Sequence, residues 1–289
     1  MTRLREAAAA LLRVLMEAAR ADNVQAVTLL TVLLHGGVFW YYTAPLTILA
    51  AIGLLVPRMR TAPGFWLVIT CLLAAANTYN WFAVDNHKFL MTWWCLAIYC
   101  SMLSPEPDRL LVFEGKILLS LCFLFAVVWK LMAPDYLDGS FFRQIMLTDQ
   151  RFESAAKYAT GADGHQLARN RRAFSKLTSP LGDQAPVKYE AGPYLDVVAT
   201  VATWWTILIE ASLAVAFLLP SRPKIEFVRH ALLVLFLFTT YAVAPVIPYG
   251  WTLLVMGLAC CPAERTRMRA AYILALFALP LYSTPLRPS

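Results

Sequence analysis

Charged residues are scarce in this chain, and the motifs that mark many soluble enzymes are missing. Asp, Glu, Lys and Arg together make up 15% of the 289 residues. The sequence contains no P-loop, no GxGxxG fingerprint, no HExxH zinc motif and no GxSxG nucleophile elbow. These absences leave nucleotide-binding, zinc-protease and serine-hydrolase functions without support.

The cysteines lack the spacing of a metal or redox site. All six lie within apolar runs, and none belongs to a CxxC pair. Cysteines in such positions usually act as small packing residues. We therefore expect no disulfide and no bound metal.

Apolar residues are abundant instead. They account for 60% of the chain, and the mean hydropathy is +0.59. Because a membrane-spanning helix needs roughly 17–25 mostly apolar residues, the sequence predicts an all-α fold, a polytopic membrane helix bundle with about eight or nine spans. The expected spans are 24–42, 45–56, 64–80, 88–104, 116–132, 194–219, 228–247, 251–262 and 268–282.

The polar breaks divide the chain into two membrane helix groups, residues 24–133 and 194–285, followed by a tail at 286–289. Residues 134–193 form one long polar segment between the groups. Roughly 60 residues is small for an independent core, so we expect an external cap on the bundle. Its sequence LARNRRAFSKL predicts a short basic helix against lipid headgroups or the bundle rim.

The first 23 residues do not match a signal peptide, because Glu6, Arg13 and Glu17 interrupt the uncharged core that such a peptide needs. We expect this segment to be retained. Its leucines share one helical face, which predicts an amphipathic helix on the cytoplasmic membrane surface. A cytosolic tail without a fixed structure is the alternative.

Positive charges fall in alternate breaks between the expected spans. The positive-inside rule places such breaks in the cytoplasm, which predicts a multi-pass protein of the plasma (inner) membrane with a cytoplasmic N-terminus. This pattern explains the formal charge of +7 better than nucleic-acid binding does. The residues counted are Arg3, Arg5, Arg13, Arg20, Arg58, Arg60, Arg109, Arg222, Lys224, Arg229, Arg265, Arg267 and Arg269.

Lys130 stands out because it lies inside the end of an apolar run. Its long stem allows the ammonium to reach the headgroups at modest cost. Alternatively, Lys130 faces the bundle interior and acts as a general base. Phe125 and Trp129 would then make its surroundings dry.

Three other polar residues are candidates for the site. Asn86 and His87 either belong to the capped first turn of a helix, with Asp85 as a further cap, or donate hydrogen bonds into an apolar pocket. Glu210 lies near the middle of a span, where a carboxylate usually faces a partner or a cavity. It either bonds a neighbouring helix, completes a proton path, or pairs with His35.

Together, DNHKFL at 85–90 and WKLMAPDYLDG at 129–139 resemble motifs of vitamin K-dependent gamma-carboxylases and the bacterial horizontally transferred transmembrane (HTTM) domain proteins. In that family an Asn-Asn-His stretch opens one membrane helix. A later helix ends in Lys-Leu, followed by an Asp-aromatic step and a glycine. Here the matching residues are Asn86, His87, Lys130, Leu131, Asp135, Tyr136 and Gly139.

The resemblance implies a membrane enzyme that uses a reduced quinone, a vitamin K-like hydroquinone, and oxygen at the outer membrane face. It implies that Lys130 is the general base and that His87 and Asn86 position the quinone. The sequence departs from the family at Asp85, which replaces the first asparagine, and at Trp129, which replaces a lysine.

Two functions are therefore expected from the sequence. The first is a quinol-dependent oxygenase or carboxylase-like enzyme acting on a small or lipidic substrate in the bilayer. The chain has no large polar domain of the kind that recruits a carboxylase's protein substrate, so we do not expect protein carboxylation. The second is a non-catalytic membrane binding, carrier, assembly or immunity protein with the same fold.

Overall fold

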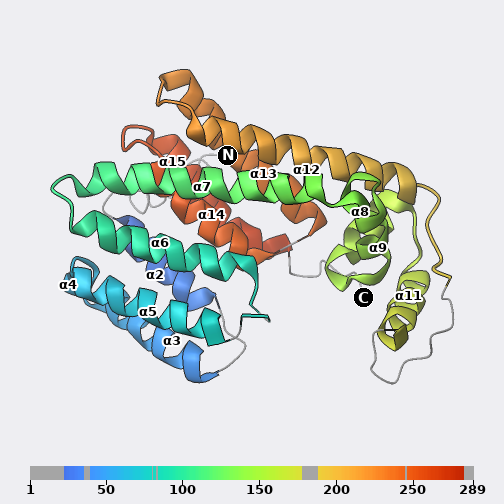
Figure 1. Ribbon diagram of the computed structural model, residues 1–289, viewed down its shortest axis with the longest axis horizontal. Helices are drawn as coiled ribbons and strands as arrows, with labels where there is room; N and C mark the ends of the chain where they lie inside the picture. Colours follow the sequence, from blue (N-terminus) through green and yellow to red (C-terminus); the bar gives the residue numbers. More distant parts are fainter. Residues whose placement is uncertain are drawn as a thin grey trace, which may run out of the picture. The chain divides into compact units, whose positions relative to one another are not determined.

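The computed structural model describes residues 23–35, 40–79, 81–82, 84–177, 188–244 and 246–282 (Figure 1). Throughout these residues the regular segments are helical, and no strand occurs among them. The predicted all-α fold is thus confirmed for the described part of the chain. The expected N-terminal helix at 1–23, except Asn23, and the tail at 286–289 lie outside it.

Three helices are long and apolar enough to cross a membrane: α7 (Pro107–Met132), α12 (Leu195–Leu218) and α13 (Pro223–Val243). Four further apolar helical segments are shorter. They are α2 (Val24–Leu34), Thr43–Leu55 within α3 (Trp40–Leu55), α5 (Pro63–Tyr79) and α14 (Ile247–Cys260). In the described residues, length and composition therefore support three candidate spans.

Several expected boundaries were wrong. The expected span 24–42 is not one helix, because α2 ends at Leu34 and residues 40–42 already belong to α3. The expected break before Pro45 lies inside α3. A proline removes one backbone donor, but membrane helices tolerate this when neighbouring groups satisfy the freed carbonyl.

The starts of three helices also lie earlier than predicted. α7 begins at Pro107 instead of residue 116, and α13 begins at Pro223 instead of residue 228. Proline is favoured at the first helical position because its missing N–H has no partner there anyway. Likewise, α15 (Thr266–Ala278) begins before residue 268.

The chain forms two compact units. Unit 1 comprises Met1–Cys122, Ala214–Val234 and Val246–Ser289, and unit 2 comprises Phe123–Leu213 and Leu235–Pro245. Helices α7, α12 and α13 each contribute residues to both units.

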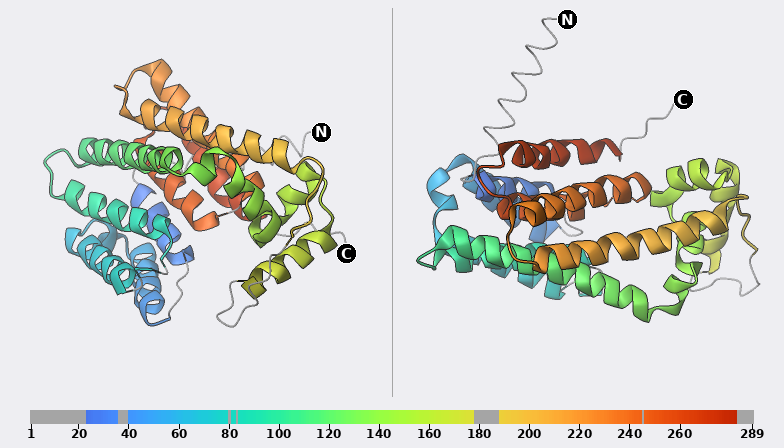
Figure 2. Two further views of the ribbon diagram at one scale, coloured as in Figure 1. Left: turned by 45° about the vertical axis from the view of Figure 1, so that its right-hand side comes forward. Right: turned by 90° about the horizontal axis from the view of Figure 1, so that it is seen from above.

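Unit 1 is built around packed helix pairs. α5 lies against α6 (Asn86–Met102), while α14 lies against α2, α6 and α15 (Figures 1 and 2). The fully buried Trp94 of α6 donates its indole N–H to the Thr28 hydroxyl of α2, at 3.1 Å. A buried indole needs such a partner, so this bond fixes α6 against α2.

Unit 2 contains the polar segment expected to form a cap. Its helices are α8 (Pro134–Leu137), α9 (Ser140–Thr148), α10 (Glu153–Ala155) and α11 (Gly164–Leu177), with a 3₁₀ turn at Gln150–Phe152 and a π turn at Ala156–Thr160. α9 and α11 pack together (Figure 2). The predicted basic helix LARNRRAFSKL is α11.

One hydrophobic cluster joins this segment to α7 and α12. Val127 of α7 and Ile207 of α12 belong to the same cluster as Phe142 of α9 and Leu167 of α11. Because these residues bury a common apolar surface, the segment is held to the ends of the two long helices by the hydrophobic effect.

Two glycines shape the segment. Gly139 has a φ of 80°, a left-handed conformation between α8 and α9 that glycine adopts without steric cost. Gly192 lies against backbone, and a Cβ there would be 2.4 Å from the Thr160 carbonyl oxygen. Only glycine permits this close approach of the two chain segments.

Candidate functional site

Lys130 lies on the inward face of the last turns of α7. Phe123, 0% exposed, and Val127, 8% exposed, precede it at helical spacing on the same face. Phe125 and Trp129 point the other way and are 65% and 74% exposed. Phe125 and Trp129 therefore do not lie on the face that carries Lys130, and the apolar residues on that face are Phe123 and Val127.

Glu210 lies on the inward face of α12. Ala199, Thr203 and Ile207 precede it at three- and four-residue steps, and all are buried. This spacing keeps them on one helical face. The face therefore carries a carboxylate within an otherwise mostly apolar row.

The two inward faces bring Lys130 and Glu210 together. The Lys130 ammonium donates a hydrogen bond to Glu210 Oε2, and the two side chains are 15% and 10% exposed. The sequence left open whether Lys130 faces the headgroups or the interior, and the structure places its ammonium against an interior partner. The partner of Glu210 is Lys130 and not His35. Because their charges cancel, the pair costs less to bury than either group alone.

Tyr136 of α8 borders this pair. Its ring centre lies 5.5 Å from Lys130 Nζ, within the range of a cation–π interaction. Its hydroxyl lies 2.6 Å from Thr206 Oγ1. Thr206 also reaches the carbonyls of Ala202 and Thr203, at 3.0 and 2.9 Å. When its one hydroxyl proton goes to either carbonyl, Tyr136 is the donor to Thr206.

Two phenylalanines of α9 pack on Tyr136. The ring of Phe141 stacks on it at 5.1 Å, with an angle of 29° between the planes, and Phe142 meets it edge-on at 5.5 Å. Phe142 is buried, whereas Phe141 is 38% exposed. The ion pair is thus flanked by an aromatic group, of which Phe141 is partly exposed.

Only part of this site could be predicted from the sequence. Tyr136 belongs to the motif quoted above, but nothing in that motif indicated a role beside the lysine. Thr206 precedes Glu210 by one helical turn, so a search of that face could have found it. Of the other motif residues, Leu131 and Asp135 are exposed.

The arrangement can store and move a proton. An ammonium has no lone pair, so Lys130 cannot accept a proton while it is charged. Transfer of one proton from Lys130 to Glu210 leaves a neutral amine beside a neutral carboxylic acid. The amine is then able to accept a proton from an acid that enters the site.

The remaining predicted residues lie in unit 1. His87 is buried in the first turn of α6, whereas Asn86, the first residue of that helix, is exposed. Asp85 occupies the capping position without a side-chain hydrogen bond. Burial therefore favours an interior role for His87 but not for Asn86.

His87 meets a second imidazole. The rings of His35 and His87 are 5.2 Å apart and tilted by 59°, and the ring of Tyr249 is 6.4 Å from His87. Both ring nitrogens of His35 are buried and have no hydrogen-bond partner. In the described residues, no group of three or more His, Cys, Asp or Glu side chains is placed to hold a metal ion.

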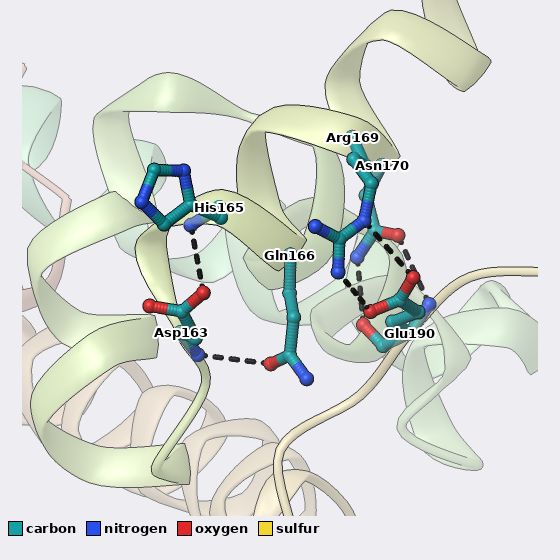
Figure 3. Close-up of polar contacts among 6 residues, drawn as sticks. All are labelled: Asp163, His165, Gln166, Arg169, Asn170 and Glu190. Carbon is teal, nitrogen blue, oxygen red and sulfur yellow. Dashed lines mark hydrogen bonds and ion pairs between the residues drawn. The ribbon is translucent and has the colours of Figure 1, made fainter.

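Helix α11 begins with a capping box (Figure 3). The Asp163 carboxylate accepts the His165 N–H at 3.1 Å, and the Gln166 side-chain oxygen accepts the Asp163 N–H at 2.9 Å. These reciprocal bonds satisfy donors that the first turn of a helix leaves free. The sequence DGHQ therefore fixes where α11 starts.

The same helix holds the segment that leads into α12. Asn170 exchanges two hydrogen bonds with the backbone of Glu190, at 2.7 and 2.9 Å, and Arg169 binds the Glu190 carboxylate (Figure 3). The hydrogen bonds from Arg169 lower the pKa of the Glu190 carboxyl below its usual value. This contact fastens residues 188–190, just before the helix that carries Glu210.

We compared the chain with known proteins. No family model, no curated protein and no solved structure matches it. The similarity to the carboxylase and HTTM proteins therefore rests on the short motifs given above.

Proposed function

We propose that this is a multi-pass inner-membrane protein whose Lys130–Glu210 pair receives the proton of a lipid-soluble acid, with a reduced quinone as the substrate. The observation that carries the proposal is the buried ion pair on the inward faces of α7 and α12. Burial of two ionisable groups in an apolar region is costly, and such groups usually serve a function. The choice of a quinone as the substrate comes from the resemblance to the carboxylase motifs.

The proposal includes the topology expected from the sequence. Three helices meet the length and hydropathy of a span. The shorter apolar helices, together with the apolar runs predicted from the sequence, would complete about eight or nine crossings. The arginine pattern would place the N-terminus in the cytoplasm.

We expect the site to accept a reduced quinone. Such a molecule, when bound, supplies an acidic hydroxyl and a redox-active ring. After passing its own proton to Glu210, the Lys130 amine accepts the hydroxyl proton and becomes an ammonium again. Phe141, which is 38% exposed, would supply an aromatic ring for stacking.

The motif resemblance also assigns a positioning role to Asn86 and His87. Both belong to unit 1, and the proposal for Lys130 and Glu210 does not depend on them. The exposed position of Asn86 gives its proposed role the weaker support.

The test measures quinone products by mass spectrometry after the protein, in nanodiscs, meets reduced naphthoquinone and oxygen. We expect an oxygenated product from the wild type and none from Lys130→Met or Glu210→Gln. Lys176→Met changes an exposed lysine of α11 and should leave the product unchanged. A product formed equally by all variants would refute the role of the pair.

A non-catalytic binding, carrier, assembly or immunity protein is the second candidate. It is favoured by one observation: the Lys130 ammonium is already engaged by Glu210, so Lys130 itself presents no free amine. In that case no product would form, but a lipid-soluble acid would co-purify with the wild type and be lost in Lys130→Met.

A further inference from the structure

Two arginines that the sequence places in cytoplasmic breaks are buried inside unit 1. Arg229 of α13 is 0% exposed and donates to the Ala216 and Leu219 carbonyls at the end of α12, at 3.1 and 2.7 Å. Arg269 of α15 is 2% exposed and donates to carbonyls at the end of α14. The expectation that both lie in breaks was wrong, because each satisfies a helix C-terminus.

Helix ends only partly balance this charge. A C-terminus offers about half an elementary charge, so a buried guanidinium keeps a positive excess. In the described residues Arg229 forms no ion pair, and its Nη1 is buried without a hydrogen-bond partner. The Nε2 atom of its neighbour His230 is likewise buried without a partner.

More cations than carboxylates gather at this end of unit 1. His230 interacts electrostatically with four cations, and the carboxylates in the same region are Glu226, which pairs with Arg265, and the exposed Glu264. The four cations are Lys116, Arg229, Arg265 and Arg269.

The accessible part of this charge lies where α12 connects to α13. The half-buried Lys116 of α7 donates a hydrogen bond from its ammonium to the Ser221 hydroxyl of that connection. Lys116 also interacts electrostatically with Arg229. Ser221, Arg222 and Lys224 are exposed. These side chains are free to meet an anion from outside the protein.

Apolar side chains border the same connection. Leu218 and Leu219 precede it and are 55% and 43% exposed, while Phe227 and Val228 follow it and are 54% and 47% exposed. A free phosphate would make no favourable contact with these apolar side chains. An acyl chain would cover them, which favours an amphiphile with a phosphate headgroup.

We propose that Lys116, Ser221, Arg222 and Lys224 bind the phosphate of an anionic phospholipid, and that the charge of Arg229 strengthens the attraction. Basic sites between membrane helices on the cytoplasmic side bind such headgroups. The site lies in unit 1 and is independent of the Lys130–Glu210 pair.

The test is native mass spectrometry of the full-length protein in detergent with added phosphatidylglycerol or phosphatidylcholine. We expect the wild type to retain phosphatidylglycerol selectively. Loss of one surface cation should weaken retention about fivefold in Lys116→Gln, whereas Lys116→Arg should retain it. Lys176→Gln, an exposed cation of α11, is the matched control and should behave as the wild type.

The double variant Arg222→Gln/Lys224→Gln changes only exposed side chains. It removes two cations and should weaken retention about 25-fold, so the test does not depend on how Lys116→Gln folds. Equal retention of the two lipids by the wild type, or equal retention by the site variants and Lys176→Gln, would overturn the proposal. Displacement of phosphatidylglycerol by millimolar inorganic phosphate would overturn the lipid assignment in favour of a free phosphate.

Discussion

Removal of one member of the Lys130–Glu210 pair should destabilise the protein more than removal of both. Lys130→Met leaves a carboxylate facing an apolar row, and Glu210→Leu leaves an ammonium there. Breaking a fully buried pair costs about 3–5 kcal/mol. Because the side chains keep 15% and 10% exposure, and because a lone carboxyl can take up a proton, we expect about 2 kcal/mol for each single change.

The double variant Lys130→Met/Glu210→Leu carries no buried charge. It should lose about 1 kcal/mol, so the coupling energy between the two positions should be about 3 kcal/mol. The assay is equilibrium unfolding of the purified protein in mixed micelles by dodecyl sulfate, followed by far-ultraviolet circular dichroism.

The control cycle uses Arg143 of α9 and Asp196 of α12, whose atoms Nε and Oδ1 are 2.6 Å apart. Their side chains are 36% and 80% exposed, so solvent screens the pair and its coupling should not exceed about 1 kcal/mol. A Lys130–Glu210 coupling below about 0.5 kcal/mol, or below that of the control, would refute the reasoning.

Two further predictions concern the cap. Gly192→Ala should make residues 188–193 more sensitive to limited proteolysis, because the added Cβ would lie 2.4 Å from a backbone oxygen. The control Gly64→Ala, whose Cβ would have no atom within 4 Å, should match the wild type. Equal sensitivity of the two variants would contradict the packing at Gly192. Arg169 lowers the pKa of Glu190, so their contact stabilises the cap above the ordinary carboxyl pKa and weakens as the pH falls through the lowered one. The protection of amides at 188–193, measured as the exchange rate relative to the intrinsic rate at each pH, should therefore fall on acidification in the wild type. It should be low at every pH in Glu190→Gln; the same pH dependence of protection in both would argue against the contact.

Helices bounded by clear changes of composition were predicted closely. The expected spans 64–80 and 194–219 correspond to α5 (Pro63–Tyr79) and α12 (Leu195–Leu218). In each case an apolar run ends at a polar or turn-forming sequence, so hydropathy and helix ends coincide.

Helices whose first turns are polar were predicted too short. α13 starts at Pro223 and runs through Lys224 and Glu226 before its apolar part begins. Hydropathy locates the part of a helix that suits lipid, but backbone hydrogen bonding continues into polar residues. For the same reason Arg229, the second residue of the expected span, was counted with the preceding break, although it lies six residues after the start of the helix.

The sequence by itself determined the class of the protein and its unusual residues. Long apolar runs predict helices, which satisfy their own backbone groups, and the rarity of charge in those helices draws attention to Lys130 and Glu210. The helical periodicity of the apolar residues also predicts which face of its helix each of them occupies.

Only the tertiary structure decided which of these groups meet. Lys130 and Glu210 are separated by 80 positions, and their contact depends on how α7 and α12 are rotated within unit 2. The pairing of His35 with His87, and the burial of Arg229 at the end of α12, likewise depend on helix packing. Such contacts arise from the burial of whole helix faces, which no local stretch of sequence specifies.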